Sequence, residues 1–322
     1  MILKALKAIA TAAAVVASTV GPSHASYPDK PVRIVVPFAP GGATDVVARA
    51  LGQRLGGLWK QQVVIDNRPG AGGNIGADAV AKAEPDGYTL LLASPAEVAI
   101  NEFLYRSMPY KPETDLVPVT RAASGPLVLV VHPSVPANTL PELITWLKSR
   151  KEGTPYASSG TGGPQHLAAE SFRAITHTNL IHVPYKGGAP AIMDLVGGQV
   201  LLFFAGLPPA LPQIHAGKLR AIGVTTKKPS PLVPGVPTID SLLPGFDFEN
   251  WQGVFAPKGT PPAIVAQIAM DIASVSDESL AAQLAAQGAV PAPLAPAQFA
   301  VFVQKERHKY AALVKSSGAK AD

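Results

Sequence analysis

The sequence of 322 residues contains no cysteine, so neither disulfide bonds nor thiol chemistry is available to it. Charged residues make up only 15% of the chain, and basic residues exceed acidic ones by five. That surplus falls to three when Lys4 and Lys7 are set aside, and no basic stripe interleaved with aromatic residues occurs. This pattern excludes nucleic acid as a partner. After residue 25 no run of about 18 apolar residues appears, so nothing there predicts a membrane span.

The motifs of several enzyme classes are also missing. The stretch Ser159–His166 is rich in glycine but lacks the lysine of a nucleotide-binding P-loop. Ser158 and Ser159 lack the leading glycine of a nucleophile elbow, and no catalytic His/Asp pair can be recognised in the sequence. The seven histidines are dispersed, without an H-E-x-x-H motif or a carboxylate cluster. We therefore predict no enzyme activity, no metal and no cofactor, and keep an exported hydrolase as the enzyme alternative.

Residues 1–25 are typical of a secretory signal peptide. Lys4 and Lys7 precede the apolar stretch Ala8–Val20, and Ser23 and Ala25 place small residues three and one positions before a cut. We expect cleavage after Ala25 and export of the mature chain. An uncleaved anchor is the alternative, although the apolar stretch is short and rich in alanine for a membrane span.

The remaining 297 residues are long enough for about two domains. Strand and helix patterns alternate from Tyr27 to about Ala123 and again from about Gly125 to Thr226, which predicts two α/β lobes with parallel sheets. Between them, Val117–Thr120 and Leu127–His132 are expected as separate strands. We assign residues 26–124 and 227–322 to lobe 1 and residues 125–226 to lobe 2. The chain then crosses twice between the lobes, which predicts a hinge.

The stretch from Val35 to Arg49 reads as a buried strand, a glycine turn and the start of a helix. The apolar run within Val32–Phe38 suits a parallel strand covered on both faces. Gly41 and Gly42 let the backbone approach another molecule closely, and Thr44 and Asp45 are residue types that cap helices. A helix N-terminus presents unpaired N–H donors beside the loop, which is an arrangement that holds an anion.

A second stretch, Pro155–Phe172, repeats this arrangement in the other predicted lobe. The hydroxyls and glycines of Ser158–Gly163 come before Pro164, which stands where the first turn of a helix tolerates proline. The carboxyl ends of parallel strands lie at one edge of a sheet, and ligands of open α/β folds bind there. We therefore predict two lobes that close on one acidic ligand.

Five motifs, taken in this order along the chain, resemble the Bug family, the receptors of tripartite tricarboxylate transporters. They are Pro37–Asp45, Asn67–Gly76, Pro85–Leu90, His182–Gly187 and Ala216–Ala221. The resemblance covers nearly the whole mature chain. It implies a periplasmic location, a two-lobed α/β fold of the type II periplasmic-binding-protein kind (a Venus flytrap), and no chemistry. It also implies a small carboxylate gripped by the two loops with the help of ordered waters, and membrane permease components as partners of a monomer. Presentation of the closed state to a sensor kinase is the alternative.

The candidate ligand-binding residues follow from the two loops and from this resemblance. Each has a structural alternative: a turn without ligand for the glycine loops, helix capping for Asp45, a core aromatic for Phe38 and a hydrogen-bonded structural residue for His166. The Asn67–Gly76 loop is expected to support the site from behind. The full set is Phe38, Pro40, Gly41, Gly42, Ala43, Thr44, Asp45, Ser94, Glu97, Ser158, Ser159, Gly160, Thr161, Gly162, His166 and Ala205.

Two departures from the family pattern bear on the ligand. Family members often carry Asp near the positions of Leu201 and Ala205, and an amino-acid ligand needs a partner for its ammonium group because a buried unpaired cation is costly. We infer from this loss that the ligand lacks an amine. Glu97 is an opposing sign if it faces the cleft and selects a ligand with a hydrogen-bond donor. The alternative for Glu97 is a solvated residue in the first turn of a helix.

Overall fold

The computed structural model describes residues 27–321, and its first three strands form a parallel sheet. They are β1 (Val32–Val36), β2 (Val63–Asn67) and β3 (Thr89–Ala93), in the order β2-β1-β3. Ile34, Val35 and Val36 are all buried, because helices cover both faces of β1. This is the buried parallel strand that the apolar run predicted.

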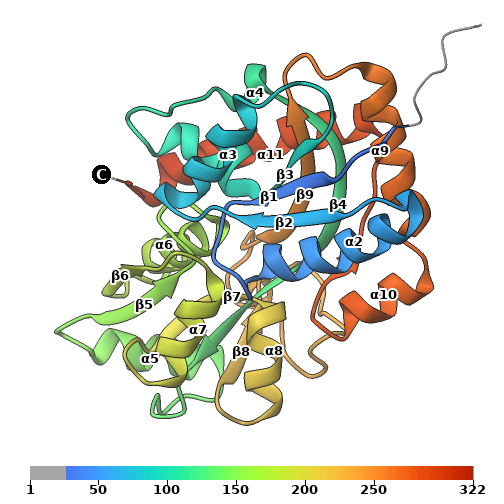
Figure 1. Ribbon diagram of the computed structural model, residues 1–322. Helices are drawn as coiled ribbons and strands as arrows, with labels where there is room; N and C mark the ends of the chain where they lie inside the picture. The colour runs from blue at the N-terminus through green and yellow to red at the C-terminus, as the bar shows by residue number, and fades with distance from the viewer. Residues whose placement is uncertain (1–26, 322) are drawn as a thin grey trace, which may run out of the picture.

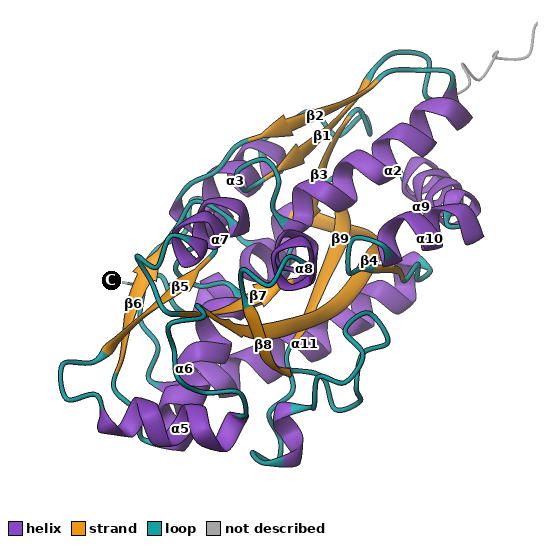
Figure 2. Cartoon of the chain, turned by 90° about the horizontal axis from the view of Figure 1, so that it is seen from below, coloured by secondary structure: helices purple, strands orange, loops and turns teal. Residues whose placement is uncertain are grey.

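Strand β4 (Leu116–Val131) links this sheet to a second one. Its first half pairs antiparallel with β9 (Glu249–Pro257) and with the short β10 (Val290–Pro291), and β9 in turn pairs with β3. Its second half pairs antiparallel with β7 (Leu202–Gly206) and β8 (Arg220–Val224). The prediction of two separate strands was wrong, because the residues between them continue the ladder with β9, with a register shift between Arg121 and Ala123. Figure 2 shows β4 as one long curved strand.

The second sheet is completed by two more parallel strands. β5 (Thr154–Ser158) lies between β7 and β6 (Leu180–Pro184), which gives the order β4-β7-β5-β6. Figure 1 shows β1, β2, β3 and β9 in the upper half of the molecule and β5 to β8 in the lower half. The structure is thus a mixed α/β fold with a curled sheet that runs through both halves.

Helices cover the faces of this sheet (Figure 1). The segment after β3 forms one π-helical turn, η3 (Ala96–Ile100), and one 3-10 turn, η4 (Asn101–Phe103). The α-helices are α2 (Ala43–Trp59), α3 (Asn74–Ala81), α4 (Pro112–Asp115), α5 (Leu140–Ser149), α6 (Pro164–Thr176), α7 (Gly188–Val196), α8 (Leu207–His215), α9 (Pro262–Val275), α10 (Glu278–Ala285) and α11 (Pro296–Ser317).

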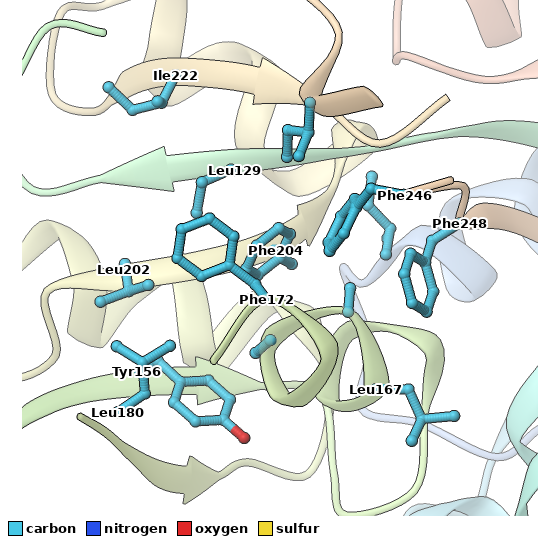
Figure 3. Packing of buried hydrophobic residues seen from close by; sticks show 14 of the residues in the cluster. Leu129, Tyr156, Leu167, Phe172, Leu180, Leu202, Phe204, Ile222, Phe246 and Phe248 are labelled. Carbon is cyan, nitrogen blue, oxygen red and sulfur yellow. The ribbon is translucent and has the colours of Figure 1, made fainter. Parts of the chain in front are cut away.

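The lower half is organised around a cluster of aromatic side chains, shown in Figure 3. Phe172 of α6 lies 5.7 Å from Phe204 of β7, and Phe204 lies 5.8 Å from Phe246, measured between ring centres. All three side chains are buried. Tilted ring pairs at these separations are favourable, and they fix α6 against the sheet, so the loop that precedes α6 has a rigid base.

Helix α11 packs against both halves of the molecule. Phe299 and Val303 near its start belong to a core cluster with Trp251 of β9. Tyr310 and Val314, further along, belong to the same cluster as Phe172. The final helix, which the sequence assigned to lobe 1, therefore also contributes to the core of the lower half.

The predicted lobe boundaries at residues 124 and 226 stay a prediction. The expected leader, residues 1–25, and the cleavage after Ala25 lie outside the described residues. Within residues 27–321, no helix has the length and apolar character needed to cross a membrane.

Tyr310 offers a test of how α11 holds the lower core. Its side chain is fully buried, and its hydroxyl has no hydrogen-bond partner within residues 27–321. A buried hydroxyl without a partner costs about 1–3 kcal/mol, so Tyr310→Phe is expected to raise the free energy of unfolding. Tyr310→Ala is expected to lower it by about 3–5 kcal/mol, because it leaves a cavity. Urea denaturation measures both, and a Phe variant less stable than the parent would show that the hydroxyl has a partner.

Candidate functional site

A small pocket lies where the carboxyl ends of the parallel strands of both halves meet. Ser94 follows β3, Ser159 follows β5 and Gly206 ends β7, while Asn250 comes from the start of the antiparallel strand β9. This is the edge at which the alternating pattern predicted a ligand. The lining residues are Phe38, Gly42, Ala43, Thr44, Ser94, Ser159, Gln165, Gly188, Gly206, Pro209 and Asn250.

Four of the described helices begin at this pocket. They are α2, α6, α7 and α8, and the residue before the first helical turn is glycine in each: Gly42, Gly163, Gly187 and Gly206. Among the described residues no side chain caps any of the four, whereas the side chains of Thr139 and Asp277 cap α5 and α10 elsewhere. The first N–H groups of a helix have no partner within it and carry partial positive charge. Their convergence makes this pocket suited to an anion.

The start of α2 differs in detail from the prediction. Gly42 is the N-terminal cap, and Thr44 and Asp45 lie inside the first turn. Asp45 turns away from the pocket and accepts hydrogen bonds from the Gly41 N–H (2.8 Å), Arg49 (2.9 Å) and Asn67 (2.9 Å). Burial opposes ionisation of Asp45, but these hydrogen bonds prevail and lower its pKa. Asp45 thus fixes the loop, and the N–H groups of Ala43 and Thr44 stay ahead of the first helical hydrogen bond, from Val46 N–H to Gly42 O.

The polar side chains that line the pocket are uncharged. Ser94, Gln165 and Asn250 contribute a hydroxyl and two amides and are each less than a tenth exposed. Gln165 and Asn250 were not among the predicted residues. Gln165 could have been found from its place just after Pro164, in the first turn of a helix, while nothing local in the sequence marks Asn250.

The two halves are in contact around the pocket, and little space remains inside. The Ala39 N–H donates to Lys186 O (2.9 Å), and the Tyr105 hydroxyl donates to Thr161 O (3.0 Å). Gly206 lies so close to Ala43 and Asn250 that a side chain there would come within 3.0 Å of both. The pocket offers about 20 Å³ to a water-sized sphere, room for about one water molecule. Entry of an organic acid therefore requires the two halves to move apart.

A larger hollow of about 210 Å³ adjoins the pocket. Phe38 and Ser159 line both spaces, so they form the wall between them. Gly160, Thr161 and the loop Gly70–Gly73 also line the hollow, together with Tyr105, Pro184, Tyr185 and Lys186. The loop that was expected to stand behind the site thus lies at this opening.

Glu97 lies behind Ser94 and is completely buried. One of its carboxyl oxygens, Oε2, accepts hydrogen bonds from the Ser94 N–H (2.8 Å) and the Ser94 hydroxyl (3.0 Å). The other, Oε1, has no hydrogen-bond partner within residues 27–321 and lies against Gly73. Burial raises the pKa of Glu97 to about 8, so this carboxyl is neutral at pH 7. The alternative of a solvated residue is wrong, and Glu97 instead orients a pocket residue from behind.

The buried residues Ser158 and His166 and the partly buried His182 support the second loop from beneath. The Ser158 hydroxyl lies 2.6 Å from His182 Nε2, the two imidazole rings stack at 4.0 Å, and His166 Nδ1 accepts a hydrogen bond from the Gly162 N–H (3.3 Å). Burial lowers the pKa of His166 to about 4 and that of His182 to about 3. The Ser–His contact is therefore between neutral groups, and the fully buried Ser158 lines neither space.

Of the predicted residues, the pocket brings together Phe38, Gly42, Ala43, Thr44, Ser94 and Ser159, and the hollow adds Gly160 and Thr161. The others, Pro40, Gly41, Asp45, Glu97, Ser158, Gly162, His166 and Ala205, line neither space. The prediction that Ala205 binds the ligand was wrong, because its side chain packs in a core cluster with Val128 and Phe203. Gly206 is the residue that reaches the pocket. Leu201 likewise packs against a core cluster.

The fold and the pocket define a class, the periplasmic binding proteins, because close structural neighbours belong to it. One of them is the periplasmic binding protein BugD, which shares 33% identity and a TM-score of 0.86, over 91% of this chain and 99% of its own. A Rhodopseudomonas palustris protein solved with adipate shares 37% identity and a TM-score of 0.89, over 91% of this chain and 99% of its own. MatC from the same species, solved with bound malate, shares 31% identity and a TM-score of 0.83, over 89% and 100%.

Within this class the particular family follows from the sequence. Residues 46–319 match the model of the tripartite tricarboxylate transporter family receptor. Protein BugT of Bordetella pertussis is 40% identical over 92% of this chain and 91% of its own length. The chain belongs to the family of tripartite tricarboxylate transporter receptors, as the five motifs indicated. This is a family of solute-binding receptors.

Within residues 27–321, no group of three or more His, Cys, Asp or Glu side chains is placed to hold a metal.

The buried Glu97 leads to a pH-dependent prediction. Its pKa is about 8 in the folded protein against an ordinary value of 4.5, so folding favours the protonated form. Its contribution to stability is complete below about pH 4.5 and is lost as the pH rises through about 8, by up to about 1.4 kcal/mol per pH unit. Glu97→Gln, which cannot ionise, is expected to flatten this decline.

Thermal or urea unfolding between pH 5 and pH 9 measures the effect. Glu84→Gln serves as the control, because Glu84 is exposed and the same charge is removed. Parallel stability profiles for the parent and the Glu97→Gln variant would contradict a neutral Glu97.

Proposed function

We propose that this receptor captures a small organic carboxylate between its two lobes and delivers it to a tripartite tricarboxylate-type transporter in the membrane. One observation carries the proposal: four helix N-termini converge, uncapped, on a pocket whose described lining has no charged side chain. Such a pocket balances a negative charge with main-chain dipoles. Relatives solved with adipate and malate support a carboxylate as the ligand class.

The available donors are sufficient in energy. Micromolar binding corresponds to about −8 kcal/mol, and a hydrogen bond to a charged group contributes about 1.5–3 kcal/mol. A helix terminus adds up to about 2 kcal/mol in a partly buried site. Three or four N–H groups from α2, α6 and α7 therefore suffice. Helix α8 contributes less, because Pro208 and Pro209 remove two donors from its first turn.

The same pocket supports a ligand without an amine. Its lining, within the described part of the chain, contains no Asp or Glu, and the nearby carboxyl of Glu97 is buried behind Ser94 and neutral. A buried ammonium group would find no anionic partner there, which is costly. Ala205 packs in the core, so the residue at position 205 does not contact the ligand and does not select against an amine.

In this proposal the protein acts as a monomer in the periplasm, after cleavage of its leader behind Ala25, and performs no chemistry. The membrane partner is tested by pull-down of the mature protein with and without its ligand. Recovery of the permease components supports the transport role, whereas recovery of a sensor kinase would assign the receptor to signalling.

A substitution of one backbone donor tests the pocket. Ala43→Pro deletes the first N–H of α2 but suits the helix, because proline is favoured at this position and Gly42 has the extended backbone that precedes it well (φ −78°, ψ 171°). Loss of one hydrogen bond to a charged group is expected to weaken carboxylate binding about 10- to 150-fold in calorimetry.

Glu278→Pro is the matched control for this donor deletion. It occupies the same position in α10, after Asp277 with φ −79° and ψ 178°, and lies outside the pocket. Affinity is expected to stay unchanged in this variant. An Ala43→Pro variant that binds as tightly as the parent would remove the α2 terminus from the site.

A further inference from the structure

A groove in the upper half combines an apolar floor with an exposed apolar residue at its rim. It lies between α11 and the chain around α4, and its volume of about 450 Å³ is within the usual range of ligand pockets. We call it the α11 groove, and its apolar lining includes Val98, Pro112, Leu116, Phe255, Val301 and Val303. Val301 is 56% exposed, whereas the other five are buried. Apolar surface left open in this way marks an interaction site, and none of it belongs to the pocket or the hollow.

The α11 groove continues toward the space between the lobes. A second depression of about 320 Å³, which we call the α4 depression, shares Pro112 and Glu113 with the groove. The α4 depression is also lined by Tyr105, and Tyr105 lines the hollow beside the pocket as well. A continuous path therefore leads from the opening of the binding site to α11, and it suits an elongated occupant.

The free charges along this path are positive. Three exposed side chains of the lining carry a positive charge and join none of the ion pairs among residues 27–321: Arg106, Lys111 and Lys305. The two acidic side chains of the lining, Glu102 and Glu113, both pair with Arg307, at 2.7 and 3.3 Å. Charges of opposite sign across an interface steer association and select the partner. The path therefore favours an acidic occupant.

The spacing of these charges favours a peptide segment over a small acid. Arg106 follows η4, Lys111 precedes α4 and Lys305 lies on α11, so the three stand on different elements. A single carboxylate contacts one such site only. A chain with several acidic residues and an apolar side chain matches both the charges and the apolar floor of the α11 groove.

The chain segment along one wall of this path also holds the two halves together. The Tyr105 hydroxyl donates to Thr161 O of the lower half at 3.0 Å. Val98, in the floor of the α11 groove, directly follows Glu97, whose carboxyl holds Ser94 of the pocket. An occupant of the path therefore contacts the segment whose position depends on closure, and it can distinguish the closed from the open arrangement.

We propose that the α11 groove and the α4 depression form the docking surface for an acidic, extended segment of the membrane partner. An apolar side chain of that segment enters the α11 groove, and its carboxylates meet Arg106, Lys111 and Lys305. The inference rests on the proposed function for the identity of the partner, a permease component. It adds the surface of the receptor that docks and the chemistry by which the partner is recognised.

Site-specific crosslinking tests the surface. Because the chain contains no cysteine, Val301→Cys introduces a single thiol into the α11 groove, and this thiol takes a photoreactive maleimide. The probe is the set of permease components recovered with the parent receptor, placed in lipid nanodiscs. Irradiation is expected to join the labelled receptor to a permease component.

Leu58→Cys is the matched control for the crosslink. Leu58 is 47% exposed and lies on α2. Helix α2 packs on Ile34 and Leu92, whereas the α11 groove belongs to the cluster of Val35 and Phe255 on the opposite face of the same sheet. The label at position 58 is therefore expected to give no adduct.

Charge reversal tests the recognition. Lys305→Glu and Arg106→Glu are each expected to weaken binding to the permease nanodiscs about tenfold or more, because an attraction becomes a repulsion. Added salt is expected to weaken binding of the parent as well. Lys60→Glu makes the same change of charge at the end of α2 and is expected to have no effect. Affinities for adipate and malate in calorimetry are expected to stay unchanged in every variant, since none of these residues lines the pocket.

The outcomes separate this inference from the proposed function. If the parent recovers the permease but the label at position 301 gives no adduct and the charge reversals have no effect, the docking surface lies elsewhere and the transport role stands. An adduct with a second copy of the receptor, or binding to nanodiscs of lipid alone, overturns the inference in the same way. If the adduct contains a sensor kinase, both the partner named here and the transport role are wrong.

Discussion

The structure depends on main-chain N–H groups that face the space between the lobes without a capping side chain. A capping Ser, Thr or Asp would satisfy these donors internally and leave nothing for a ligand. Glycine before each of the four helices avoids that, and it also lets the two halves meet closely, as Gly206 does against Ala43. Binding strength and closure therefore have the same origin, namely backbone that no side chain shields.

Exposed donors of this kind need rigid loops, and the rigidity comes from buried polar groups that do not touch the ligand. Asp45 ties the first loop to Arg49 and Asn67, and the stacked histidines with Ser158 tie the second. Glu97 holds Ser94 by two hydrogen bonds. Asp45, Glu97, Ser158 and His166 are all buried and lie one residue or one turn behind a residue that lines the pocket. This explains why so many residues that sequence reasoning placed in the site stand just outside it.

Much of the fold could be predicted, because its signals are local. The apolar run followed by Gly41 and Gly42 marks a strand, a turn and a helix whatever the rest of the chain does. The continuity of β4 was missed because it is fixed by the ladder with β9, a strand more than a hundred residues away. The double role of α11 was missed for the same reason, since Tyr310 finds its partners only after the lower half has formed.

The residues of the site divide in the same way, into those that local sequence signals mark and those that distant parts of the chain place there. Ser94 and Ser159 directly follow strands, and Phe38, Gly42, Ala43 and Thr44 lie in the loop and the helix start after β1, so their position at the sheet edge follows from the alternating pattern. Asn250 lies on β9, which runs antiparallel to β3, and no spacing pattern in the sequence indicates that it lines the pocket. Ala205 was predicted to bind the ligand from the resemblance to the family. Because side chains alternate along β7, the Ala205 side chain packs in the core.

The closed arrangement has a consequence for affinity. The hydrogen bonds from Ala39 to Lys186 and from Tyr105 to Thr161 connect the halves through protein atoms alone. Closure is therefore favoured in part before any ligand is bound, and a ligand must enter a conformation with more space than about 20 Å³. The apparent affinity then falls by the fraction of molecules that are open enough to admit it. Contacts between the lobes thus hinder entry of the ligand, whereas contacts with the ligand favour it. Both kinds of contact slow the release of a bound ligand. A receptor that must later release its ligand therefore needs both to be of modest strength.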